Sequence, residues 1–245
     1  MTNPTKPIYL GKIPSASGSS MWRDIKVFKN YAFIVSEASG HGLQIFDLTK
    51  LRGIYHEQTH SVDLTYTGFG QAHNIAINEG SGYAYPTGIK EKGLHILNIK
   101  DPMNPVLELE YPENGYSHDA QVINYKGPDQ NYHGKEIFIG SNEDRVVLVD
   151  VTNKLEPKLL SVFNYDHQYT HQSWVTSDHK YILMGDEYDE LNIDFQLVNK
   201  TRTIIINIED LENPKLHFNY LAKTDAIDHN GYVKGSNFYL SLIHI

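Results

Sequence analysis

Hydrophobic residues occur along the chain in short runs, mostly of three to five positions, separated by turn residues. The clearest example spans residues 116–163 and contains a turn region rich in Gly, Pro, Asp and Asn. Short runs of β-branched and aromatic residues between such turns predict strands that pair as an antiparallel meander. The four predicted strands of this unit lie at residues 120–122, 136–139, 146–149 and 159–163.

The same order of strands recurs before and after this unit. One four-stranded sheet cannot bury both of its faces alone, so the recurrence predicts copies packed side by side. The run 8–10, which follows Pro7, is expected to be an outer strand that precedes the first full unit. A fifth copy opens at His229 and reaches residues 238–240. Corresponding second and third strands are expected at 31–35 and 43–47, at 83–85 and 94–98, and at 181–184 and 203–207.

The spacing of turn residues is the strongest sign of a repeat. A Pro follows an Asx residue by seven positions in three units: Asn98 to Pro105, Asp150 to Pro157 and Asn207 to Pro214. An Asx side chain at a strand end can accept a hydrogen bond from the backbone two residues on, and Pro suits the entry to an edge strand. A two-sheet sandwich would not need the same turn in every unit. The sequence therefore predicts an all-β fold, a β-propeller of four-stranded antiparallel blades.

We expect residues 1–245 to form a single propeller domain with four complete blades and a partial fifth. The net charge of −9 and the lack of a basic cluster argue against nucleic acid as a partner. No apolar run approaches the ~18 residues of a membrane span. The chain has no Cys, which excludes disulfides and thiolate metal sites. The first residues lack the charged and apolar regions of a signal peptide.

Four segments of the sequence are distinctive: residues 22–27, 33–37, 68–74 and 148–151. Together they resemble the choice-of-anchor B family, bacterial surface proteins built on repeats named for a Leu-Val-Ile-Val-Asp strand. The resemblance extends from about residue 7 to 240. It implies a propeller, six-bladed in its full form, with an extracytoplasmic or cell-surface location and no established catalytic activity. Family members continue beyond the point where this sequence ends, so we expect the domain to be C-terminally incomplete, with open strand edges.

Polar residues open the first strand of each predicted blade, and the loops between second and third strands return to the same face. We therefore expect a polar ring around the channel mouth. Imidazoles and carboxylates that converge on one axis suit a divalent cation, Ca²⁺ or Zn²⁺, or a small polar ligand. The predicted metal ligands are His73, His118, His171 and His229. The candidate ligand-binding residues are these four with Arg23, Asp24, Asn74 and Asp119, and the loop residues Glu37, Glu143 and Glu187.

Three functions are compatible with this ring. The first is a non-enzymatic binding module for a polar small molecule, a cation or a protein. The second is a metal-dependent hydrolase or lyase. The third is a purely architectural ring, in which each polar side chain satisfies backbone groups of a neighbouring blade.

Two other segments match metal-binding patterns. Residues 56–60 read His-Glu-Gln-Thr-His, the pattern of zinc proteases, which requires a helix to bring both imidazoles to one face. Alternation at Val62, Leu64 and Tyr66 favours a strand instead, in which the two His would lie about 13 Å apart, at ~3.3 Å per residue. We expect this segment to supply the outer strand of blade one. The acidic loop with Asp186, Glu187, Asp189 and Glu190 can hold Ca²⁺ through carboxylate oxygens.

Overall fold

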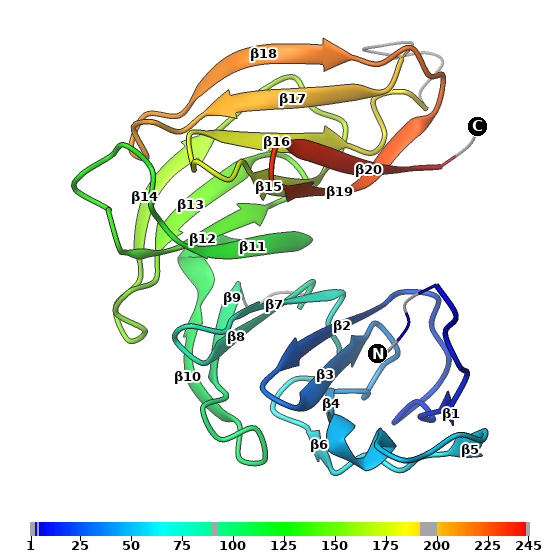
Figure 1. Cartoon of the computed structure of the whole chain (residues 1–245). Coiled ribbons are helices and arrows are strands. Elements are labelled where there is room, and N and C mark those ends of the chain that lie inside the picture. Colours follow the sequence, from blue (N-terminus) through cyan, green and yellow to red (C-terminus); the bar gives the residue numbers. More distant parts are fainter. Residues whose placement is uncertain (1–2, 4, 90–92, 192–199, 244–245) are drawn as a thin grey trace.

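The computed structural model describes residues 3, 5–89, 93–191 and 200–243. Four antiparallel sheets of four strands and one of the two two-stranded sheets are arranged around a common axis, as the predicted propeller requires (Figure 1). Blade one contains β2 (Arg23–Phe28), β3 (Tyr31–Ser36), β4 (Leu43–Asp47) and β6 (Leu64–Tyr66). Blade two contains β7 (Asn74–Asn78), β8 (Tyr83–Thr87), β9 (Leu94–Asn98) and β10 (Val106–Tyr111).

The later blades follow the same order. Blade three contains β11 (Asp119–Asn124), β12 (Glu136–Ser141), β13 (Val146–Asp150) and β14 (Lys158–Phe163). Blade four contains β15 (Thr170–Val175), β16 (Tyr181–Asp186), β17 (Arg202–Asn207) and β18 (Lys215–Leu221), and blade five is the hairpin of β19 (Ile227–Lys234) and β20 (Asn237–Ile243). The first strands of successive blades, β2, β7, β11, β15 and β19, contact one another in that order.

The predicted turn between third and fourth strands is confirmed. The side chains of Asn98, Asp150 and Asn207 each accept a hydrogen bond from the backbone N–H two residues on, at 3.1, 2.9 and 2.8 Å. Asp47 makes the same bond to Thr49, at 2.8 Å, at the start of the 3₁₀ helix η1 (Leu48–Leu51). One local interaction thus ends the third strand in all four complete blades.

The N-terminal segment differs from the prediction. Residues 8–10 are not a strand, and Ile8 and Tyr9 are exposed. The strand is instead β1 (Gly11–Lys12), which pairs in parallel with β5 (Gln58–Thr59). Gly11 allows this close approach, because a Cβ at that position would lie 1.7 Å from the carbonyl oxygen of Gln58.

The His-Glu-Gln-Thr-His segment is extended, as predicted, and contains β5. It does not, however, supply the outer strand of blade one. That strand is β6, a few residues later, which pairs with β4. The imidazole of His60 lies 3.1 Å from the carbonyl oxygen of Leu10, so β5 anchors the N-terminal segment and has no zinc-protease geometry.

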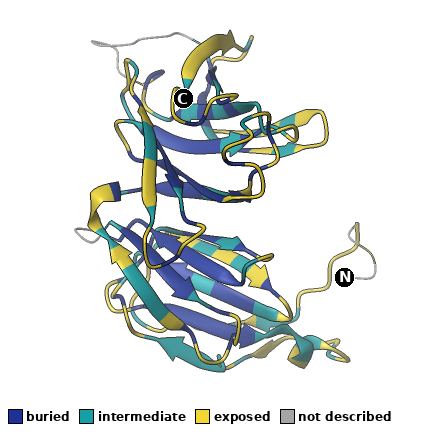
Figure 2. Cartoon of the chain, turned by 90° about the vertical axis from the view of Figure 1, so that its left-hand side faces the viewer, coloured by how far each residue is buried: buried dark blue, intermediate teal, exposed yellow. Residues whose placement is uncertain are grey.

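The core lies between the blades, where both faces of each sheet are covered. Residues alternate along a strand between opposite faces. In blade three, Phe138 and Val147 therefore pack against blade two, while Ile139 and Leu148 pack against blade four. A third cluster, which includes Phe33 and Ile75, joins blades one and two. This two-sided burial explains why the second and third strands of the blades are nearly continuous apolar runs (Figure 2).

The edges of the structure are more exposed. Every residue of β18, the outermost strand of blade four, is exposed. Besides η1, the described ranges contain one short 3₁₀ helix, η2 (Pro112–Asn114). None of their helices has the length and apolar character needed to cross a bilayer.

A buried polar network joins blades two and three. Glu136, which is 5% exposed, accepts hydrogen bonds from the hydroxyls of Tyr85 at 2.6 Å and Ser81 at 3.1 Å. Its second oxygen lies 3.0 Å from the Nζ of Lys154, which also donates to the Val151 carbonyl oxygen at 2.6 Å. The carboxylate is compensated on all sides, which is the condition for burying a charge.

We expect Tyr85→Phe to lower the free energy of unfolding by about 1.5–3 kcal/mol, because it removes a hydrogen bond to a buried charge without creating a cavity. Urea unfolding measures the difference. Tyr55→Phe is the matched control, since the Tyr55 ring is exposed. A loss no larger than that of the control would contradict the network.

Candidate functional site

The starts of the first strands and the loops between second and third strands surround a cavity of about 510 Å³ at the channel mouth. All of the predicted site residues except Glu143 line it. Blade geometry is responsible, because equivalent positions of successive blades lie at the same height around the axis. Their role in binding stays a prediction, but their convergence is a feature of the fold.

Glu143 is exposed and does not line the cavity. Its carboxylate accepts a hydrogen bond from the hydroxyl of Tyr169 at 3.1 Å, and Tyr169 lines the cavity. Asp186 is also turned away, because its carboxylate accepts from the backbone N–H groups of Gln168 and Tyr169, at 2.8 and 2.6 Å. The carboxylate that reaches the cavity from this loop is that of Glu187.

Aromatic residues form much of the wall and were missed by the sequence analysis. Tyr116 and Tyr169 line the cavity, together with Trp22 and Tyr188. A signal was present, since Tyr116 stands two residues before His118 and Tyr169 stands two residues before His171. The cavity therefore combines imidazoles and carboxylates with phenol rings.

The four histidines form a stack that crosses four blades. The ring centroids of His73 and His118 lie 4.1 Å apart, those of His118 and His171 lie 4.6 Å apart, and those of His171 and His229 lie 4.7 Å apart. The Nδ1 of His73 lies 2.6 Å from a carboxylate oxygen of Glu37. The first ring of the stack is thus held by the loop of the preceding blade.

Hydrogen bonds between blades fix the protonation of the two central rings. The Nδ1 of His118 lies 3.2 Å from the carbonyl oxygen of His171, and the Nδ1 of His171 lies 3.1 Å from that of His229. A carbonyl oxygen only accepts, so each Nδ1 must carry a hydrogen. Burial lowers the pKa of His118 to about 3 and that of His171 to about 2, aided by the neighbouring imidazoles. Both rings are therefore neutral near pH 7, with the lone pair on Nε2.

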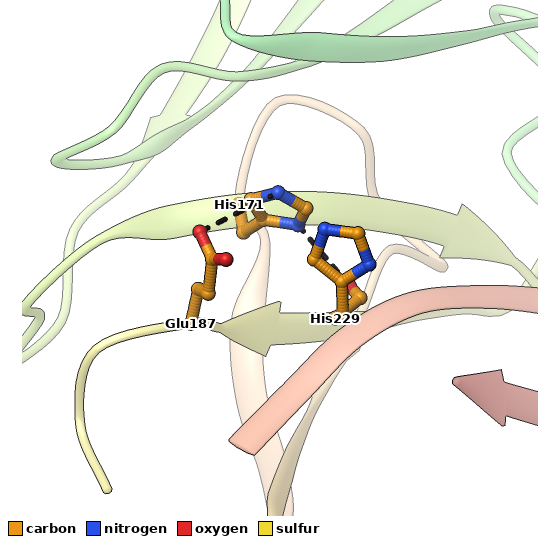
Figure 3. A group of neighbouring side chains, drawn as sticks. All are labelled: His171, Glu187 and His229. Carbon is orange, nitrogen blue, oxygen red and sulfur yellow. Dashed lines mark hydrogen bonds and ion pairs between the residues drawn. The ribbon is translucent and has the colours of Figure 1, made fainter. Parts of the chain in front are cut away.

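The Nε2 lone pair of His171 faces a carboxylate. The Nε2 atom lies 3.6 Å from Oε2 of Glu187 (Figure 3). His171, Glu187 and His229 each offer one ligand atom, and these three atoms all lie within 4.8 Å of one another. Burial raises the pKa of Glu187. A lone pair and a carboxylate oxygen that face each other need a proton or a cation between them. The structure thus gathers two of the four predicted histidine ligands with one predicted loop carboxylate, whereas His73 is engaged by Glu37.

The other polar residues of the ring bind backbone groups. Asp24 accepts a hydrogen bond from the backbone N–H of Ile75 in the next blade, at 3.1 Å. Asn74 accepts from the same N–H at 2.6 Å. Burial raises the pKa of Asp119 to about 6. All three residues line the cavity, and Asp24 also joins blade one to blade two.

A larger cavity, of about 780 Å³, lies between the N-terminal segment and η1. Its lining includes no imidazole or carboxylate among the described residues. The smaller cavity at the channel mouth is the one with convergent ionisable groups, which is the usual mark of a functional pocket.

Solved structures similar to this chain include a β-propeller domain. A protein assigned as a 6-phosphogluconolactonase from Bacteroides uniformis aligns with a TM-score of 0.62 and 12% identity, over 93% of this chain and 64% of that one. The hydrazine synthase of Kuenenia stuttgartiensis aligns with a TM-score of 0.58 and 12% identity, over 85% of this chain and 50% of that one. The Cps50 (Swd1) β-propeller domain of Myceliophteria thermophila gives 0.55 and 12%, over 94% and 63%.

The chain is a repeat β-propeller, and these structures support that class. At such low identity they show the fold alone, and the chain spans about half to two thirds of their lengths. Residues 69–112, which contain blade two, match the model of the LVIVD repeat. No curated protein matches the sequence.

The neutral histidines make stability depend on pH. In the unfolded chain they bind protons below about pH 6.5, whereas His118 and His171 stay neutral in the fold down to about pH 3. The free energy of unfolding should therefore fall as pH drops below about 6.5, by up to about 1.4 kcal/mol per pH unit for each histidine. Asp119 acts in the opposite direction between about pH 4 and 6, because burial raises its pKa to about 6 in the fold.

Urea unfolding in the presence of a chelator, at pH 7 and pH 5, tests this dependence. His118→Asn should reduce it, while His133→Asn, at an exposed position, should leave it unchanged. Imidazole ¹⁵N chemical shifts should show the Nδ1–H tautomer at both pH values. Titration of His118 near pH 6.5 in the folded protein would contradict the assignment.

Proposed function

We propose that the protein is a non-enzymatic binding module whose channel mouth binds a divalent cation, together with the polar ligand or protein group that the cation coordinates. The ligands of the cation are the Nε2 of His171, a carboxylate oxygen of Glu187 and the imidazole of His229. The supporting observation is the 3.6 Å contact between the His171 Nε2 and Glu187, with the opposite nitrogen of that ring committed to a carbonyl oxygen.

The ligand set favours a metal such as Zn²⁺ over Ca²⁺. Imidazole nitrogen with carboxylate oxygen is a usual Zn²⁺ environment, whereas Ca²⁺ prefers oxygen alone. Two ligands at ~2.0–2.1 Å from a tetrahedral ion lie ~3.4 Å apart, which is close to the observed 3.6 Å. The neighbouring rings of Tyr169 and Tyr188, whose centroids lie 4.8 Å apart, offer a surface for the rest of a bound group.

A second candidate function rests on the same residues. Three protein ligands leave a coordination position for water, as in catalytic zinc sites, and a metal-dependent hydrolase or lyase would use that water. The LVIVD repeat match and the propeller fold fit a binding module, which is why binding is the first candidate. The resemblance to choice-of-anchor B proteins supports assignment to that family and an extracytoplasmic or cell-surface location, which we also propose.

Isothermal titration of chelator-treated protein with Zn²⁺ should show one site per chain. Glu187→Gln should weaken binding by about 10–100-fold, because the amide keeps the shape of the side chain but loses the charge and the stronger donor oxygen. His171→Ala should weaken it at least as much. His133→Ala is the control for adventitious binding to an exposed imidazole.

Two results would reject the cation site. One is the absence of Zn²⁺ binding by the unsubstituted protein, and the other is equal affinity in Glu187→Gln and the control variant. Near-UV circular dichroism of each variant verifies that the fold is retained.

A further inference from the structure

A second group of ionisable residues lies outside the channel mouth, at the contact between blades four and five. The loop after β16 carries Asp189 and Glu190, both buried. Arg202, at the start of β17, contacts Asp189 through its guanidinium at 2.6 Å and donates its backbone N–H to Glu190 at 3.0 Å. One carboxylate oxygen of Glu190 and one of Asp189 therefore contact Arg202 of blade four.

Asp228 enters this group from another blade. It lies on β19 and has no exposed surface. Neither of its carboxylate oxygens has a hydrogen-bond partner in the described part of the chain, and the same is true of Oδ1 of Asp189. Ligand atoms from Asp189, Glu190 and Asp228 all lie within 4.8 Å of one another. A buried carboxylate without a donor is costly, so this geometry requires a proton or a cation between the facing oxygens.

The sequence is adapted to bring Asp228 to this position. Its Oδ2 lies where a side chain on Gly185 would begin, since a Cβ there would be 1.7 Å from that oxygen. Only glycine at 185 lets the carboxylate reach the backbone of β16. Thr201 fixes the preceding segment from the other side, because its hydroxyl donates to the Ala226 carbonyl oxygen at 2.6 Å.

The charge of the group matches a divalent ion. Three ionised carboxylates and the one guanidinium of Arg202 leave a net charge of −2. Burial raises the pKa of all three carboxyls, to about 6 for Asp189 and about 9 for Glu190. The protein alone thus stabilises these charges poorly, and burying them uncompensated would cost several kcal/mol.

We propose that Asp189, Glu190 and Asp228 bind one Ca²⁺ ion that joins blade five to blade four. All of the ligand atoms are oxygens, which a hard cation requires. Ca²⁺ coordinates oxygen at ~2.3–2.6 Å, so two ligands on opposite sides of it lie ~4.8 Å apart, the limit within which these atoms already fall. The two oxygens of Asp228 are both available for bidentate coordination.

This site is independent of the proposed cation at the channel mouth. It uses different residues, oxygen ligands alone and a different metal. Its role is structural, because β19 contacts blade four through β15 and β16 and the ion would link Asp228 of β19 to the loop after β16.

Full-length protein treated with a chelator and then dialysed should bind one Ca²⁺ per chain in isothermal titration. Its thermal midpoint should rise by about 5–10 °C at Ca²⁺ concentrations ~100-fold above Kd. Asp228→Asn should bind Ca²⁺ at least tenfold more weakly and lose this rise. In chelator its midpoint should equal or exceed that of the unsubstituted protein, because the amide has the shape of the carboxyl group and is neutral without a bound proton or ion.

Asp225→Asn is the matched control, since its side chain is 71% exposed and lies three residues before Asp228. It and His171→Ala should keep the Ca²⁺ response, which separates this site from the channel mouth. Glu190→Gln provides a second test if Asp228→Asn fails to fold, because it keeps the oxygen that accepts from Arg202. Absence of Ca²⁺ binding by the unsubstituted protein, or unchanged affinity in a folded Asp228→Asn or Glu190→Gln variant, would overturn the proposal.

Discussion

The inner strands of neighbouring blades do not pair with each other, and this constraint governs the centre of the molecule. Each such strand has backbone groups that face the next blade, and buried backbone groups need partners. Polar side chains supply them: Asp24 accepts from the N–H of Ile75, Gln121 from that of Val175, and Gln172 from that of Gly231. A polar side chain near the start of each inner strand is thus a requirement of the architecture before it is a sign of function.

His118 and His171 meet the same requirement with only one of their two ring nitrogens. The Nδ1 of His118 and of His171 each bind a carbonyl oxygen of the following blade. Asn or Gln could make that one bond, but an imidazole fixed at Nδ1 keeps a second nitrogen whose lone pair has a defined direction. The architectural and ligand-binding interpretations of the ring are therefore compatible, because they concern different atoms of the same side chain.

Much of the fold could be predicted because it depends on local chemistry. The sequence shows the apolar runs of the second and third strands. It also shows the Asx residues that form the turn hydrogen bond, Asn98, Asp150 and Asn207. The β1–β5 pairing could not be found, since it depends on a long-range approach to Gly11. The polar ring followed from blade symmetry, but the direction of each loop side chain did not: Glu37 and Glu187 reach the cavity, while Glu143 accepts a hydrogen bond from Tyr169 and does not line it.

Alternation along the chain divides the acidic and imidazole residues of blades four and five between two environments. Asp228 and His229 are adjacent on β19, and successive side chains of a strand point to opposite faces. Asp228 enters the closed contact with blade four, whereas His229 lines the channel mouth. In the loop after β16, Glu187 lines the mouth and Asp189 enters the contact. Along the chain, His229 directly follows Asp228, and Glu187 lies two residues before Asp189. Side chains one or two positions apart therefore serve a closed contact between blades and an open cavity, because the backbone turns them to opposite sides.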